Sequence, residues 1–160
     1  MKRGPCFPQG RCESGYTEVR GTEIRTFGVS EGDVTAIDDW IERVAEKWAI
    51  NQRAAFRVRL CVAELAANVL EHGNKNAVDG GHMAVTIRKV ADGVEVEFLD
   101  SLGAFDLTRA SETVAPRSEP GGWGLKLVRA YAKELSYVEE GGCNRVRFTI
   151  SSRDETAGSA

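Results

Sequence analysis

Two polar side chains in the middle of an apolar segment have the chemistry of a metal site. Glu64 and Asn68 lie between Phe56 and Leu70, where helical spacing places apolar side chains, Phe56 included, around most of the circumference. Positions i and i+4 are neighbours on one side of a helix. Magnesium prefers oxygen ligands and is usually held by one or two protein groups together with phosphates. The pair therefore fits a magnesium site, or else an ordinary solvated face. The whole polar stripe of this segment is Arg53, Arg57, Glu64, Asn68 and Glu71.

A second candidate is Asp100, which ends an alternating apolar segment and is followed by Ser101, Leu102 and Gly103. A side chain at the end of a strand is held rigidly by the sheet, which suits a binding group. A carboxylate there can accept a hydrogen bond from an exocyclic amino group such as that of adenine. An ordinary Asp/Ser/Gly turn fits the same residues.

A third candidate is the glycine cluster Gly121, Gly122 and Gly124 at the start of a helical pattern. Glycine lets the backbone approach a ligand closely, and the free amides at a helix N-terminus favour phosphate. A plain hinge between the preceding proline-containing segment and the helix is the alternative.

Taken together, the three segments resemble the GHKL ATPase superfamily over roughly residues 16–150. The string ELAANVLEHG, starting at Glu64, resembles its N-box, and DSLGAFD, starting at Asp100, resembles its adenine-binding box. The string GWGL, starting at Gly122, resembles its later glycine box, and the segment before it falls where the superfamily has its ATP lid. The small size, the NVLEHG form and the ending Phe105-Asp106 resemble one branch, the anti-sigma factor serine kinases of bacterial partner switching.

This resemblance implies a role for each matched residue. Glu64 would act as general base, Asn68 would bind magnesium, and Asp100 would bind the adenine amino group. The other implied nucleotide contacts are Gly103, Gly122, Gly124, Leu125 and Thr149. Leu102 is a departure, because the superfamily usually has glycine at that position and this chain has it one residue later. Two lid arginines, Arg109 and Arg117, are available to neutralise charge at the phosphates, and the sequence does not choose between them.

The function implied by the resemblance is that of an anti-sigma factor with serine kinase activity. Its cofactors would be ATP and Mg²⁺, and it would phosphorylate an anti-sigma factor antagonist, a single-domain α/β protein, on serine. It would also sequester a sigma factor or an equivalent target and pair with itself through a sheet edge. A second hypothesis is a non-catalytic module of the same fold that binds ATP as a structural ligand or not at all. A third, the catalytic part of a histidine kinase, is disfavoured because no helix bearing a phosphoacceptor histidine is evident.

The elements that must position these residues follow from hydrophobic periodicity. We expect a strand or hairpin over 16–28, a helix over 30–48, and a second helix capped by Asn51 and ended by Gly73. A hairpin should follow, with strands over 83–87 and 94–99 and a turn at Asp92-Gly93, then a long loop over 107–120. A helix over 123–135 and a closing hairpin of 136–139 and 143–150 complete the chain. This order predicts a two-layer α/β (α+β) sandwich, with a mostly antiparallel mixed sheet covered on one face by three helices.

The whole-chain properties restrict the class of protein. With 160 residues the chain has room for one domain, expected over 15–150, with flexible tails at 1–14 and 151–160. A net charge of −3 argues against nucleic-acid binding. No apolar run approaches the roughly 20 residues that span a bilayer, and no signal peptide is evident, so we expect a cytoplasmic protein. The four cysteines lack metal-ligand spacing, and Cys61 and Cys143 fit small core positions.

Overall fold

The computed structural model describes residues 17–19, 21–72, 81–101 and 123–153. The predicted N-terminal tail lies outside these residues, as do Leu102, Gly103, Gly122 and the two lid arginines.

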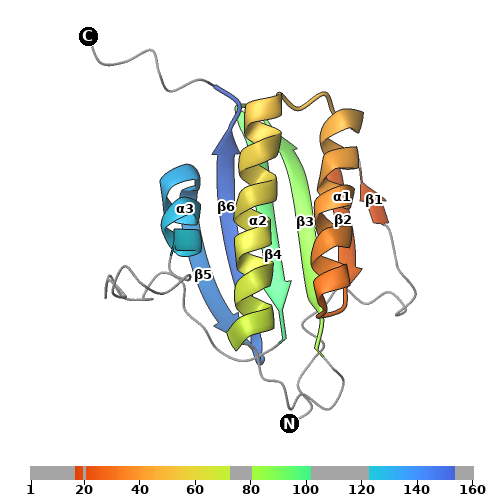
Figure 1. Ribbon diagram of the computed structural model, residues 1–160. Helices are drawn as coiled ribbons and strands as arrows, with labels where there is room; N and C mark the ends of the chain where they lie inside the picture. The colour runs from red at the N-terminus through yellow and green to blue at the C-terminus, as the bar shows by residue number, and fades with distance from the viewer. Residues whose placement is uncertain (1–16, 20, 73–80, 102–122, 154–160) are drawn as a thin grey trace.

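Six strands form one sheet in the order β1-β2-β3-β4-β6-β5 (Figure 1). Their bounds are β1 Thr17–Val19, β2 Thr22–Phe27, β3 Met83–Val90, β4 Gly93–Asp100, β5 Lys133–Glu140 and β6 Cys143–Ser151. Every neighbouring pair of these described strands is antiparallel, so the expectation of a mixed sheet is wrong. Three of these pairs are hairpins, which are antiparallel by construction, and the two pairs that join the hairpins, β2–β3 and β4–β6, are antiparallel as well.

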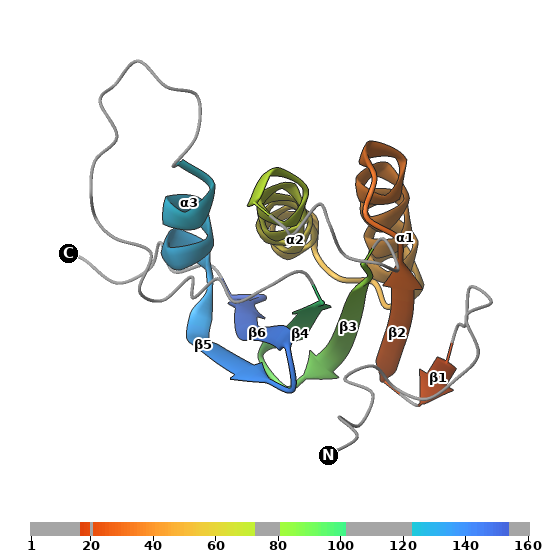
Figure 2. The ribbon, with the colours of Figure 1, turned by 90° about the horizontal axis from the view of Figure 1, so that it is seen from below.

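Three helices cover one face of the sheet, which confirms the two-layer architecture (Figure 2). They are α1 Glu31–Lys47, α2 Gln52–His72 and α3 Trp123–Tyr131, and α2 lies between the other two. The Ser30 hydroxyl accepts a hydrogen bond from the Asp33 amide at the start of α1. Asn51 Oδ1 accepts one from the Ala54 amide at 2.8 Å, so Asn51 caps α2 as predicted. None of the three helices in the described part of the chain is both long enough and apolar enough to cross a bilayer.

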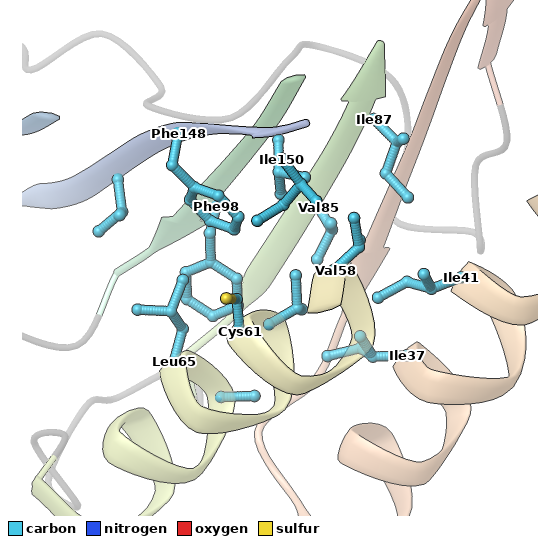
Figure 3. Packing of buried hydrophobic residues seen from close by; sticks show 14 of the residues in the cluster. Ile37, Ile41, Val58, Cys61, Leu65, Val85, Ile87, Phe98, Phe148 and Ile150 are labelled. Carbon is cyan, nitrogen blue, oxygen red and sulfur yellow. The ribbon is translucent and has the colours of Figure 1, made fainter. Parts of the chain in front are cut away.

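The core lies between α1, α2 and the sheet (Figure 3). Cys61 and Leu65 point from α2 toward Phe98 of β4 and Phe148 of β6, and all four side chains are buried. In β4 and β6 the even-numbered side chains face the helices, because Val94, Val96 and Phe98 belong to this core together with Val146, Phe148 and Ile150. This alternation decides which strand residues can reach the helix side of the sheet.

The segment after α3 differs from the prediction. α3 ends at Tyr131 rather than at residue 135, and β5 already begins at Lys133. The pairing of β5 with β6 shifts between Lys133 and Ser136, and Glu134 has a φ of 54°. This irregularity lets Leu135 pack against the core from a strand, where its apolar side chain had favoured a longer helix.

The turn of the β3–β4 hairpin lies one residue earlier than predicted. Ala91 and Asp92 form it, and Gly93 is the first residue of β4. A Cβ at Gly93 would lie 2.0 Å from the carbonyl oxygen of Ile150, so only glycine fits this approach of β4 to β6.

The described structure includes residues 151–153, which the sequence analysis placed in the C-terminal tail. β6 includes Ser151, the Ser152 amide donates to the Asp92 carbonyl at 2.9 Å, and Arg153 pairs with Asp92. Asn51 donates through Nδ2 to the Ser152 carbonyl at 2.9 Å. These bonds hold residues 151–153 against the fold.

Two further expectations need correction. Phe56, placed by periodicity among the apolar positions of α2, is 59% exposed because it points away from both the sheet and the core. Cys143 is buried as expected, but it takes part in a disulfide whose other cysteine lies outside the described residues. Cys61 is a buried free thiol, as predicted.

Candidate functional site

The polar stripe of α2 faces α3. Two arginines of α2 show the orientation: Arg59 pairs with Asp38 of α1, and the Arg57 guanidinium lies 5.2 Å from the centre of the Tyr131 ring of α3. Glu64 and Asn68 follow Arg57 by seven and eleven residues, which places each within about 20° of Arg57 around the helix axis. They are therefore on the α3 side of α2 and half-buried, whereas Arg53 and Glu71 of the same stripe are exposed.

The start of α3 lies beside the same part of α2. α3 runs opposite to α2 (Figure 1), and its last residue, Tyr131, meets Arg57 near the N-terminal end of α2. Counting seven residues back along α3 gives Gly124, and seven forward along α2 gives Glu64, each about 10 Å from that contact. Gly124 in the first turn of α3 is therefore level with Glu64, and the amides in the first turn of a helix have no partner within the helix and favour an anion.

Glu64 and Asn68 are half-buried without a fixed partner. Among the described residues, no hydrogen bond or ion pair holds either side chain. Glu64 nevertheless affects a buried neighbour through its charge. The pKa of the Cys61 thiol is raised to about 12, mainly by burial and further by the charge of Glu64. Half-buried oxygen atoms without protein partners match the few protein ligands that magnesium takes beside phosphate.

Asp100 ends β4 on the helix side of the sheet. As an even-numbered residue of β4 it shares that side with Phe98, and it is only 6% exposed. α2 and β4 run in the same direction (Figure 1). Asn68 lies seven residues beyond Cys61, about 10 Å along the helix, and Asp100 lies two beyond Phe98, about 7 Å along the strand. Because Cys61 packs toward Phe98, the side chains of Asn68 and Asp100 are at the same end of the helix layer and the sheet.

Two residues that the sequence analysis did not single out are linked to Asp100 by hydrogen bonds, one directly and one through the other. Asn144 of β6 pairs with Asp100 in register and donates from Nδ2 to Asp100 Oδ1 at 2.9 Å. The hydroxyl of Tyr137 in β5 donates to Asn144 Oδ1 at 2.7 Å. The sequence did contain a signal for Asn144, because it is a polar residue in the register of Val146, Phe148 and Ile150, as Asp100 is in that of Phe98. The link to Tyr137 required the register of the β5–β6 hairpin.

Thr149 is not brought to this place. It is an odd-numbered residue of β6, on the face away from Asp100, and it pairs with Glu95 near the other end of the strand. Its hydroxyl donates to Glu134 Oε2 at 3.2 Å. It is five residues from Asn144, about 16 Å along the strand. We therefore leave Thr149 out of the site.

The remaining predicted positions are only partly described. Gly124 and Leu125 belong to α3, but the side chain of Leu125 is not among the described ones. Gly103 and Gly122 lie outside the described residues, so their roles stay predictions.

On the flank of α2 that faces α1, the charged side chains are paired with one another. Arg59 donates to both oxygens of Asp38, from Nε at 2.7 Å and from Nη2 at 2.5 Å, and to Glu42 Oε1 at 3.0 Å. The hydrogen bond to Asp38 raises the pKa of Arg59 above its usual value. A hollow of about 390 Å³ lies beside this cluster between α1 and α2, with Phe56 and Ile50 in its lining.

Comparison with known proteins agrees with the motif resemblance. Residues 29–150 match the family described as histidine kinase-like ATPase domains. The serine/threonine-protein kinase BtrW of Bordetella bronchiseptica is 31% identical over 140 residues, which cover 82% of this chain and 96% of that protein.

A solved histidine kinase domain from the blue-light activated histidine kinase of Erythrobacter litoralis EL346 is a more distant likeness. It is 19% identical, with a TM-score of 0.47 over 75% of this chain. The chain covers 59% of that structure's length.

Proposed function

The chain belongs to the family of histidine kinase-like ATPase domains, and from this premise we propose that it binds ATP with magnesium and phosphorylates a partner protein on serine. The observation that carries the proposal is the pair Glu64 and Asn68. Both are half-buried on the α3 side of α2, and within the described part of the chain neither has a hydrogen bond or an ion pair. Such groups cost free energy unless a ligand satisfies them.

Different residues of the chain bind different parts of Mg²⁺–ATP. Asn68 holds the metal through its amide oxygen, and Asp100 accepts a hydrogen bond from the adenine amino group. The amides in the first turn of α3, around Gly124, bind phosphate oxygens. Magnesium, when bound, neutralises charge on the phosphates. Gly103, Gly122 and Leu125 belong to the same proposal on the strength of the motifs alone.

Glu64 acts on the acceptor in the transfer step. It takes the proton of the serine hydroxyl while the serine oxygen forms a bond to the γ-phosphorus. The bond between that phosphorus and the bridging oxygen of ATP breaks, and ADP leaves. Because phosphoryl transfer depends mainly on alignment and charge neutralisation, groups fixed on a helix between two others suit it well.

The partners follow from the resemblance of the motifs to the anti-sigma factor serine kinases. The acceptor is an anti-sigma factor antagonist, and the regulated target is a sigma factor or its equivalent. Phosphate added to the antagonist weakens its binding through charge at the interface. A homodimer through a sheet edge is part of the same proposal, and the two edge strands of the described sheet are β1 and β5.

The test is transfer of labelled phosphate. The purified chain is incubated with γ-labelled ATP, Mg²⁺ and a candidate antagonist encoded by a neighbouring gene. We expect label on a serine of the antagonist, and we expect Glu64→Gln to bind ATP but to lose transfer by about 10²–10⁴-fold. Glu42→Gln is the matched control, because Glu42 is a carboxylate of the other helix, 53% exposed and paired with Arg59.

The outcomes separate the competing functions. If Glu64→Gln labels the antagonist as fast as the unchanged chain, Glu64 is not the base. If the chain binds ATP and its partners but never labels an antagonist, the non-catalytic module is the correct function.

A further inference from the structure

We propose that Asn144 and Tyr137 are positioning residues that hold the Asp100 carboxylate, and that they thereby set a preference for nucleotides whose purine carries a 6-amino group. The inference rests on the proposed function, because it takes Asp100 as the group that meets the base. The two residues act through Asp100 and do not touch the nucleotide in this proposal.

The three side chains form a chain of hydrogen bonds across neighbouring strands. Asp100 of β4 stands opposite Asn144 of β6, and Tyr137 comes from β5 on the far side of β6. The bonds measure 2.9 Å from Asn144 Nδ2 to Asp100 Oδ1 and 2.7 Å from the Tyr137 hydroxyl to Asn144 Oδ1. Asp100 and Asn144 are 6% and 3% exposed, so water competes little for these bonds.

Only one orientation of the Asn144 amide satisfies both neighbours. An ionised carboxylate only accepts hydrogen bonds, so the NH₂ group must face Asp100. The amide oxygen then faces Tyr137, whose hydroxyl donates to it. Tyr137 therefore fixes the amide, and the amide fixes the plane of the carboxylate. Without the Tyr137 hydroxyl, the amide oxygen loses this hydrogen bond, which opposes rotation of the amide.

A carboxylate held in this way recognises hydrogen-bond donors. Its two oxygens have about four lone-pair sites, so Asp100 can accept from Asn144 and from a ligand amino group at once. A 6-oxo purine such as hypoxanthine presents an acceptor at the same place, and two facing acceptors repel. Buried polar groups left unpaired make such rejection strong. The preference depends on the direction in which the carboxylate points, and Asn144 and Tyr137 determine that direction.

The experiment compares nucleotides that differ only at position 6 of the purine. Dissociation constants with Mg²⁺ are measured for ATP, inosine triphosphate and purine riboside triphosphate, which has no 6-substituent. The proteins are the unchanged chain, Asn144→Ala, Tyr137→Phe and Asp100→Asn. Thr86→Val is the matched control, because Thr86 is a buried polar residue of β3, 4% exposed and paired with Glu97 away from Asp100.

We expect the unchanged chain and Thr86→Val to prefer ATP over the other two nucleotides by at least about tenfold. Asn144→Ala should bring the ratio to within about twofold, mostly by weakening ATP, because the phosphate contacts are common to all three ligands. Tyr137→Phe should lower the ratio about threefold. A role in folding alone would change the melting temperature and leave the ratio of affinities unchanged.

The contrary results are distinguishable. If Asp100→Asn loses the preference while Tyr137→Phe and Asn144→Ala keep it, the positioning role is overturned and the proposed function stands. Should Asn144→Ala not fold, Tyr137→Phe is sufficient: an unchanged ratio of nucleotide affinities in that variant overturns the positioning role. If the unchanged chain binds all three nucleotides equally, or none, the adenine contact of the proposed function fails, and this inference fails with it.

Discussion

The two flanks of α2 carry similar residue types and use them in opposite ways. On the α1 flank Arg59 is bound by Asp38 and Glu42 at 2.5 to 3.0 Å, so each charge has a partner within the protein. On the α3 flank Arg57 lies over the Tyr131 ring, and Glu64 and Asn68 have no such partner among the described residues. Both flanks are parts of one helix over one apolar core.

Under the proposed function, this difference separates polar residues that stabilise the fold from polar residues that bind a ligand. A carboxylate that is already paired with arginine gains little from a metal ion, because its charge is neutralised. A half-buried carboxylate and amide without partners keep their oxygen atoms available to a ligand, although burying them lowers the stability of the fold. We infer that the α1 flank is structural and the α3 flank is functional.

The largest effect on stability is expected in the core beneath α2, against which both flanks of the helix rest. Phe98, 1% exposed, lies beneath Cys61 and Leu65 of α2, so Phe98→Ala should lower the free energy of unfolding by about 3–5 kcal/mol. Urea unfolding followed by circular dichroism measures this change. Phe56→Ala is the control and should change it by less than about 0.5 kcal/mol, since Phe56 is 59% exposed. Equal losses for the two variants would contradict this assignment of the core.

The next largest effect tests the α3 flank directly. Asn68→Ala should weaken binding of Mg²⁺–ATP at least about a hundredfold, or about 2.7 kcal/mol, because the metal loses a protein ligand. Its thermal stability should not fall, because no partner among the described residues loses a hydrogen bond. Isothermal titration calorimetry measures the affinity. Unchanged affinity would remove the distinction between the flanks.

The reverse result is expected on the α1 flank. Arg59→Met should cost about 1 kcal/mol of unfolding free energy, because it breaks a paired but partly exposed network, and the loss should shrink at high salt. The affinity for Mg²⁺–ATP should stay the same. Chemical unfolding at low and high salt, with nucleotide titration, checks both parts. A loss of nucleotide affinity would show that this flank also serves the site.

The smallest effect near neutral pH comes from Cys61 between the flanks. Burial, with a further contribution from Glu64, raises its pKa from 9.0 to about 12. Between these values the unfolded chain loses the thiol proton while the folded chain keeps it, so stability should fall as pH rises from about 9 toward 12. Below pH 9 this group should have no effect. Unfolding of Cys61→Ala in parallel isolates the contribution, and an identical pH dependence for both proteins would exclude it.

The same thiol gives a chemical test. Iodoacetamide at pH 8 should leave Cys61 unmodified in the native protein and alkylate it after unfolding, since only the thiolate reacts. Peptide mass spectrometry reads both states.

Much of the fold could be read from local patterns. Ser30 and Asn51 start α1 and α2 where capping residues precede helical periodicity, and the alternation over Val94, Val96 and Phe98 marks β4. These signals depend on neighbours a few residues apart. Local patterns did not predict the end of α3, because Leu135 fits an apolar helix position and an apolar strand position equally well. The pairing of β5 with β6 decides between the two.

The candidate site divides in the same way. Side-chain chemistry and spacing along one helix were enough to single out Glu64 and Asn68, and the polar ending of an apolar strand was enough for Asp100. The flank to which the stripe turns, the separation of Thr149 from Asp100, and the links through Asn144 and Tyr137 came only from the folded chain. Asp100 and Asn144, 44 positions apart in the sequence, become neighbours through strand order and register, which arise from packing of the whole sheet and leave no periodic trace in the sequence.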